Sequence, residues 1–397
     1  MPTPSHKTSR NKTHAHWGGV FAMTFCVFIL IASEFLPVSL LTPIARDLHV
    51  TEGLAGQGIA ISGVLAVLTS LTISQVAGNM NRKYLLLGLT FLMAVSGMVI
   101  FLASSYAVYM VGRALIGITI GGFWSMSAAT AIRLVPQHQV PRALAIFNGG
   151  NALATVVAAP LGSYLGATVG WRGAFLCLVP LAIAAFIWQC VSLPTMEIDR
   201  ERKPHRSVLR LFRLSSVSTG LIACGLFFMG QFALFTYVRP FLETVTRVNA
   251  SGLSLILLAI GVAGFVGTLI ITKFLNARFY QTLIMIPLLM ATIAGALLLA
   301  GHSAWTVAAL LSLWGMLATA APTGWWTWIA RTLPEDAEAG GGLMVAVIQL
   351  SIALGSTTGG WVFDRLGWQS SFGLSGALLL GAAAMTFLSS RQANPVH

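Results

Sequence analysis

Apolar residues along this chain fall into twelve long runs separated by short polar stretches. A helix needs about 20 apolar residues to cross the hydrocarbon core of a bilayer, and each run has roughly that length. The runs cover residues 17–41, 54–77, 84–103, 108–129, 143–165, 173–192, 215–238, 252–272, 282–300, 304–330, 342–362 and 371–390. This pattern predicts an all-α membrane protein with twelve transmembrane helices.

A polar stretch at residues 193–213 divides the predicted spans into two sets of six. We therefore expect an N-terminal tail at 1–16, a six-helix half at 17–192, a linker at 193–213, a second six-helix half at 214–390 and a C-terminal tail at 391–397. The basic residues of the linker suit either a topology signal or contact with anionic lipid headgroups, and the first is the interpretation we favour.

The two halves resemble each other at a constant offset of 197 residues. The sequence GWRGAF from Gly170 aligns with GWQSSF from Gly367, and Pro43 aligns with Pro240. The same offset places Gln231 at the position of Glu34. A parallel duplication of six helices predicts a pseudo-symmetric bundle with its binding site between the halves.

Composition supports a lipid environment and charge supplies the orientation. Only 9% of the residues are charged, whereas soluble domains contain about a quarter. The net charge of +12 would suggest nucleic acid binding in a soluble protein, but here the basic residues sort by loop. Seventeen lie on the side of both termini and five on the other. The positive-inside rule then predicts cytoplasmic termini, and we expect a monomer that binds no nucleic acid.

Two charged residues lie inside predicted spans, Glu34 in the first and Arg113 in the fourth. Charge within hydrocarbon costs about 3 kcal/mol on insertion scales, so such residues are functional candidates. Glu34 is our candidate for binding and releasing a proton, with Arg113 as its electrostatic partner. The alternatives are a structural buried pair for both residues and a packing role for Arg113.

Small residues and a proline indicate close packing and bending. Gly117 and Gly121 share one helix face with Arg113, so a neighbouring helix can approach there. In the fifth predicted span, Pro160 removes a helical hydrogen bond and Gly162 follows it, which favours a hinge.

Amide and aromatic side chains inside the spans predict a cavity for a neutral small molecule. Amides both donate and accept hydrogen bonds, and aromatic rings stack on planar ligands. The candidates for binding substrate are Phe35, Phe123, Trp124, Asn148, Asn151, Gln231 and Gln349. Trp325, Trp326 and Trp328 stand near one end of the tenth span, where membranes favour an interfacial belt.

Metal and enzyme chemistry have no support in the sequence. The four cysteines sit in apolar runs without a CxxC pair, and the eight histidines lie in tails and loops. Nucleophile groupings and phosphate-binding loops do not occur either. We expect neither cofactor nor metal, and no enzymatic activity.

The chain resembles the major facilitator superfamily, in particular its twelve-span drug:proton antiporters. The resemblance is carried by GNMNRKYLLL after the second span, by RALIG from Arg113 and by Ala159-Pro160 in the fifth span. It implies a role for Arg113 in proton translocation. The segments SEFLPVSLLTPIARDL, GGFWSMSAATAIRLVP, FTYVRP and VAVIQL resemble branch members that export purine ribonucleosides. The resemblance thus implies export of inosine- and guanosine-type substrates in exchange for protons.

Two other functions remain open from the sequence. Sugar exporters of the same superfamily share the pattern around Glu34 and Phe35, so sugar or multidrug efflux by the same antiport mechanism is the alternative. A membrane sensor that does not transport is the rival from another class.

Overall fold

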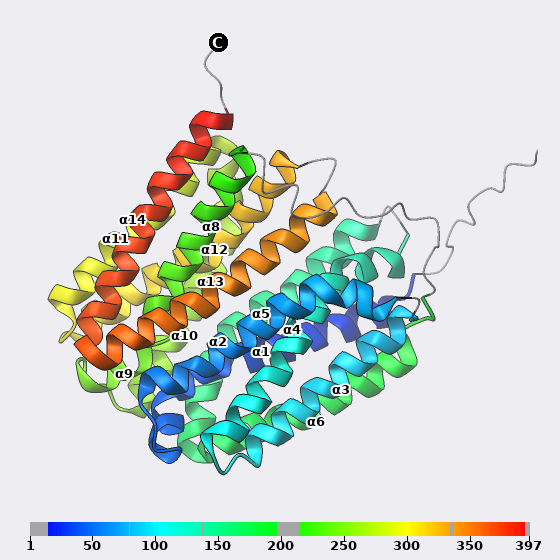
Figure 1. Cartoon of the computed structure of the whole chain (residues 1–397), viewed down its shortest axis with the longest axis horizontal. Helices are drawn as coiled ribbons and strands as arrows, with labels where there is room; N and C mark the ends of the chain where they lie inside the picture. Colours follow the sequence, from blue (N-terminus) through cyan, green and yellow to red (C-terminus); the bar gives the residue numbers. More distant parts are fainter. Residues whose placement is uncertain (1–14, 79, 137–138, 197–214, 334–336, 394–397) are drawn as a thin grey trace, which may run out of the picture.

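The computed structural model describes residues 15–78, 80–136, 139–196, 215–333 and 337–393. The helices of the first half are α1 (Trp17–Asp47), α2 (Glu52–Ala77), α3 (Arg82–Phe101), α4 (Tyr106–Leu134), α5 (Val140–Thr168) and α6 (Gly170–Ser192). Those of the second half are α8 (Ser215–Phe235), α9 (Val238–Thr244), α10 (Ala250–Ala277), α11 (Phe279–Ala300), α12 (Ala304–Thr332), α13 (Ala337–Leu366) and α14 (Trp368–Ala393) (Figure 1).

Lengths and compositions confirm the predicted all-α membrane fold. Eleven stretches of the described residues are long and apolar enough to cross a membrane, and α8 and α9 together form one of them, Val217–Thr244. The twelfth predicted span, α5, has sufficient length but is not among the eleven. Helix α5 contacts both α1 and α10.

The outer surface of the bundle carries large apolar side chains. Leu299 is 89% exposed and Trp305 is 87% exposed. Such exposure suits contact with lipid tails, which are as apolar as these side chains.

The same 197-residue offset relates the helices of the two halves in order. It places α1 on α8 and α9, α2 on α10, α3 on α11, α4 on α12, α5 on α13 and α6 on α14. Gly170 and Gly367, which the offset aligns, both adopt a positive φ, of 77° and 84°. Only glycine enters this backbone region readily, so the duplicated GW motif specifies the same tight turn twice.

The predicted linker and tails fall largely on residues that the structure does not describe, so the domain division stays a prediction. Helix α6 ends at Ser192 and α8 begins at Ser215, so the linker lies between them. Helix α14 continues to Ala393, beyond the predicted end at residue 390. The linker residues 197–214 and the tails 1–14 and 394–397 lie outside the described residues.

The halves meet along two pairs of helices, α2 with α13 and α5 with α10. We call the end that carries the α1–α2 connection and α9 the distal end, and the opposite end, where α1 begins and α14 finishes, the terminal end (Figure 1). At the distal end, the Asp364 carboxylate of α13 accepts hydrogen bonds from Thr51 Oγ1 at 2.6 Å and from the Gly53 amide at 3.0 Å. This contact joins α13 to the N-terminus of α2, whose dipole favours an anion.

Candidate substrate and proton site

Glu34 lies in the contact between the two halves. Its side chain is 8% exposed, and Gln349 of α13, 6% exposed, donates a hydrogen bond from Nε2 to Glu34 Oε1 at 3.2 Å. Among the residues that the structure describes, Gln349 is the hydrogen-bonding partner of this carboxylate. The membrane-embedded acid of one half is therefore held by an amide of the other half.

Arg113 is fully buried and binds α1 and α2 together. It donates hydrogen bonds from Nε to the Gly58 carbonyl at 2.9 Å, from NH1 to the Ser33 carbonyl at 3.0 Å and from NH2 to Ser62 Oγ at 3.0 Å. These three groups, and no carboxylate, are its hydrogen-bond acceptors within the described chain. Arg113 thus anchors the backbone next to Glu34. Its part in proton translocation stays a prediction.

A proline explains why the Ser33 carbonyl is available to Arg113. Pro37 stands four residues after Ser33 in α1 and has no amide hydrogen, so it leaves the Ser33 carbonyl without its helical donor. A buried carbonyl without a donor is costly, and the guanidinium supplies one. Pro37, Ser33, Gly58 and Ser62 were not among the predicted site residues. The four-residue spacing between Ser33 and Pro37 was the available signal for one of them.

Two of the aromatic candidates occupy different surroundings. Phe35 of α1 stacks on Phe232 of α8, with ring centroids 6.1 Å apart and an interplanar angle of 24°. These residues are equivalent under the internal repeat, and they face each other across the interface next to Glu34. Phe123, in contrast, is fully buried in the core of the first half, where it packs rather than lines a cavity.

The remaining polar and aromatic candidates lie on α4, α5 and α8. Trp124 is half-buried and meets Phe147 edge to face at 6.2 Å. Asn151 is half-buried on α5, whereas the side chain of Asn148 lies outside the described part of the chain. Gln231 directly precedes Phe232, and its Oε1 is buried and has no hydrogen-bond partner within the described chain.

Glycines and Pro160 allow the close helix contacts around this site. A Cβ on Gly117 or Gly121 would collide with the backbone of α2 at Ser62 and Ala66. A Cβ on Gly162 would collide with Ser39 and Leu36 of α1. The hinge role of Pro160 in α5 stays a prediction; the proline leaves the Val156 carbonyl without its helical donor, beside Gly261 of the other half.

The tryptophans of α12 differ from the sequence expectation. Trp325 and Trp328 are each 2% exposed and pack edge to face in the core of the second half, so they form no interfacial belt. Trp326, on the opposite side of the helix, is 41% exposed. The helical period explains the difference, because Trp325 and Trp328 are three residues apart and therefore share the inward face of α12.

The described residues contain no group of three or more histidine, cysteine, aspartate or glutamate side chains that could hold a metal ion.

Comparison with known proteins decides the family. Residues 23–355 match the Major Facilitator Superfamily. The chain belongs to this superfamily. It is a major facilitator with a transporter's multi-pass membrane fold, which confirms the resemblance seen in the sequence.

This major facilitator is 63% identical over 382 residues to the protein named transcription regulatory protein OpdE of Pseudomonas aeruginosa, covering 96% of the chain and 95% of OpdE. It is 40% identical over 365 residues to the purine ribonucleoside efflux pump NepI of Salmonella paratyphi C, covering 92% of each. Among solved structures it resembles the nucleoside transporter NupG with a TM-score of 0.77 over 94% of the chain and 99% of NupG. Identity to NupG is 10%, so this likeness shows the fold alone.

Proposed function

We propose that this major facilitator is a proton-coupled antiporter that exports purine ribonucleosides of the inosine and guanosine type by alternating access. The terminal end faces the cytoplasm and the distal end faces the periplasm of a bacterial inner membrane. The charge distribution of the loops supports this orientation. The substrate class rests on the 40% identity to proteins named purine ribonucleoside efflux pumps.

The observation that carries the proposal is the hydrogen bond between Glu34 and Gln349. A titratable group at the contact between the halves has different surroundings in each conformation of the bundle, because separating the halves removes its partner. Protonation and conformation are coupled for this reason. A carboxylate buried inside a single half would lack this link.

The transport cycle follows from the geometry. With the distal end closed, as here, nucleoside enters from the cytoplasm and Glu34 gives up its proton to that side. When the bundle opens distally, the contact with Gln349 breaks, a periplasmic proton binds Glu34 and nucleoside leaves. Phe35, Trp124, Asn151 and Gln231 are the described candidates for contacting the base and ribose.

The driving force suffices for accumulation outside the cell. The membrane potential contributes about 2.3 kcal/mol per charge per 100 mV. At about 1.4 kcal/mol per tenfold ratio, one proton per cycle supports a concentration ratio of about fifty.

Purified protein in liposomes tests this proposal. We expect labelled inosine to exchange in counterflow, an imposed pH gradient to drive it uphill, and inosine to release protons from the protein in detergent. Glu34→Gln should retain counterflow and lose uphill transport, whereas Glu52→Gln, at the half-buried first residue of α2, should behave as wild type. Uphill transport by Glu34→Gln would refute the proton role.

The substrate alternative is tested with the same preparation. An arabinoside or a lipophilic cation that releases protons while inosine does not would replace the nucleoside assignment by sugar or multidrug efflux. The antiport mechanism would then remain and only the cargo would change.

A regulatory role is the second candidate, and the 63% identity to a protein named as a transcription regulatory protein favours it. A sensor would bind a small molecule between the halves without moving it across the membrane. It predicts inosine binding without counterflow, and cellular nucleoside resistance that is unchanged by Glu34→Gln.

A further inference from the structure

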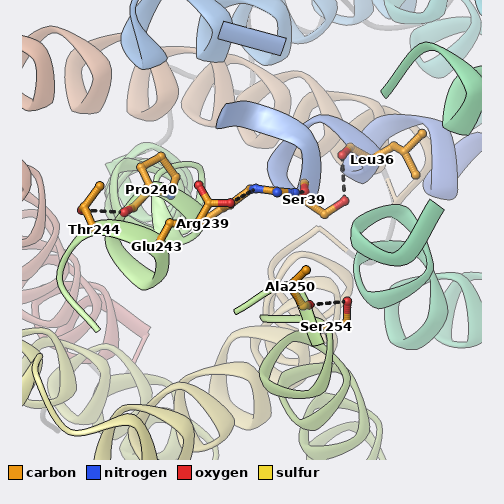
Figure 2. A network of polar contacts seen from close by, with 8 residues as sticks. All are labelled: Leu36, Ser39, Arg239, Pro240, Glu243, Thr244, Ala250 and Ser254. Carbon is orange, nitrogen blue, oxygen red and sulfur yellow. Dashed lines mark hydrogen bonds and ion pairs between the residues drawn. The ribbon is translucent and has the colours of Figure 1, made fainter. Parts of the chain in front are cut away.

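Arg239 of α9 reaches across the interface between the halves at the distal end. Its NH1 donates a hydrogen bond to the Ser39 carbonyl of α1, and its Nε donates to Glu243 Oε1, one turn along α9, at 2.8 Å. Figure 2 shows the guanidinium extending from Glu243 to Ser39. The arginine side chain is 11% exposed, so it is largely removed from solvent in this closed arrangement.

The acceptor of this contact exists because of a proline. Pro43 stands four residues after Ser39 within α1 and cannot donate the helical hydrogen bond to the Ser39 carbonyl. The carbonyl therefore needs another donor whenever it is buried. In the closed distal end, Arg239 supplies that donor from the other half.

Helix α1 contains two carbonyls that a proline leaves without a helical donor, and each is bound by a different arginine. Pro37 leaves the Ser33 carbonyl to Arg113, which belongs to the same half and can hold it in every conformation. Pro43 leaves the Ser39 carbonyl to Arg239, which belongs to the other half. The first contact is compatible with opening of the bundle, whereas the second must break.

The internal repeat shows that this contact is one-sided. The offset of 197 residues aligns Pro43 with Pro240 but aligns Arg239 with Thr42. The first half thus has no arginine equivalent to Arg239. The arginine therefore occurs in the second repeat alone, whereas the proline occurs in both repeats.

We propose that Arg239 is a latch that holds the distal end closed by binding the carbonyl that Pro43 leaves free in α1. Glu243 orients the guanidinium through Nε so that NH1 meets Ser39. The contact between Asp364 and the N-terminus of α2 closes the same end along the α2–α13 seam. The latch rests on the alternating access of the proposed function, but on neither its cargo nor its coupling ion.

Accessibility of a buried cysteine tests the latch. Val38 is 1% exposed and packs with the core of the second half, next to Ser39. We would use full-length Val38→Cys in which Cys177→Ala and Cys190→Ala remove the exposed and half-buried thiols. A membrane-impermeant maleimide, applied from the distal side without cargo or pH gradient, then labels the cysteine when this end opens.

Two variants break the latch by different routes. Arg239→Gln removes the charged donor, and Pro43→Ala restores an amide that competes with Arg239 for the Ser39 carbonyl. We expect each to raise the labelling rate about tenfold. Pro37→Ala is the matched control, because its carbonyl is held within one half, and Arg247→Gln controls for the loss of an exposed positive charge at the distal end. Both controls should label at the rate of the parent.

The outcomes separate the latch from the proposed function. Unchanged labelling in folded Arg239→Gln and Pro43→Ala, or an equal rise in Pro37→Ala, overturns the latch even if inosine exchanges in counterflow. If inosine does not exchange in counterflow but labelling still rises in Arg239→Gln and Pro43→Ala, the latch is supported. The assignment of nucleosides as the cargo is then wrong. Size-exclusion profiles confirm folding, and Pro43→Ala decides the result if Arg239→Gln aggregates.

Discussion

Gln349 of α13 donates a hydrogen bond to Glu34 of α1 across the interface between halves, at 3.2 Å and 315 residues away in sequence. In the proposed transport cycle, the helices that carry these two side chains separate when the bundle opens distally. Their contact therefore exists in one conformation and is lost in the other. The predictions below concern this contact and the helix packing that positions it.

Gln349→Ala should weaken proton-driven transport more than it weakens binding. A hydrogen bond to a charged group is worth about 1.5–3 kcal/mol, so its loss disfavours the closed conformation with ionised Glu34 by tenfold or more. Uphill uptake of labelled inosine into inverted vesicles under a pH gradient measures the effect. Leu350→Ala, on an exposed position of the same helix, should leave uptake unchanged. Equal uptake by both variants would show that the amide has no part in coupling.

Arg113→Ala should destabilise the first half, and Pro37→Ala should partly restore it. The single change leaves the Ser33 carbonyl without this donor, at about 1–3 kcal/mol for a buried acceptor, whereas the Gly58 carbonyl keeps the hydrogen bond from Ser62 Oγ. In the double variant, the new amide at residue 37 donates to Ser33. The midpoints of thermal unfolding in detergent measure the stability of the single and the double variant. If Pro37→Ala lowers the midpoint further in the Arg113→Ala background, the proline does not free this carbonyl.

Gly121→Ala should destabilise the bundle where Gly149→Ala does not. A Cβ at position 121 meets the backbone of Ala66, which cannot rotate away, and overpacking of this kind costs about 1–3 kcal/mol. A Cβ at Gly149 meets open space, so alanine there should be neutral or slightly stabilising. The difference between the two unfolding midpoints checks the prediction, and equal midpoints would mean that α4 does not approach α2 this closely.

Phe232→Ala should reduce nucleoside binding and loosen the interface together. The stacked pair with Phe35 joins the halves, and such aromatic pairs contribute about 0.5–1.5 kcal/mol beyond their buried area. We expect the concentration of inosine for half-maximal counterflow to rise severalfold. Phe123→Leu should leave this concentration unchanged, since Phe123 lies in the core of the first half. A rise for Phe123→Leu alone would reverse these assignments.

The sequence by itself determined the membrane fold, the duplication and the position of the acid. Each of these features can be read directly along the chain. The apolar runs match the thickness of the bilayer, the repeat has one constant offset, and the acid stands within an apolar run. They are readable without coordinates, and so the sequence identified Glu34, Arg113, Gly117 and Gly121 as candidates. The burial of Trp325 and Trp328 was misread because composition near a helix end does not reveal which face turns inward.

Only the tertiary structure decided which groups meet. Gln349 pairs with Glu34, Arg113 holds Ser33 and Arg239 holds Ser39, at separations of 315, 80 and 200 residues. Pro37 and Pro43 of α1 indicate that two carbonyls need hydrogen-bond donors from outside the helix. The sequence does not indicate which neighbouring helix provides each donor. Helix packing places a donor from the same half at the Ser33 carbonyl and a donor from the other half at the Ser39 carbonyl. Hydrogen bonding depends on distance in space and not on distance along the chain.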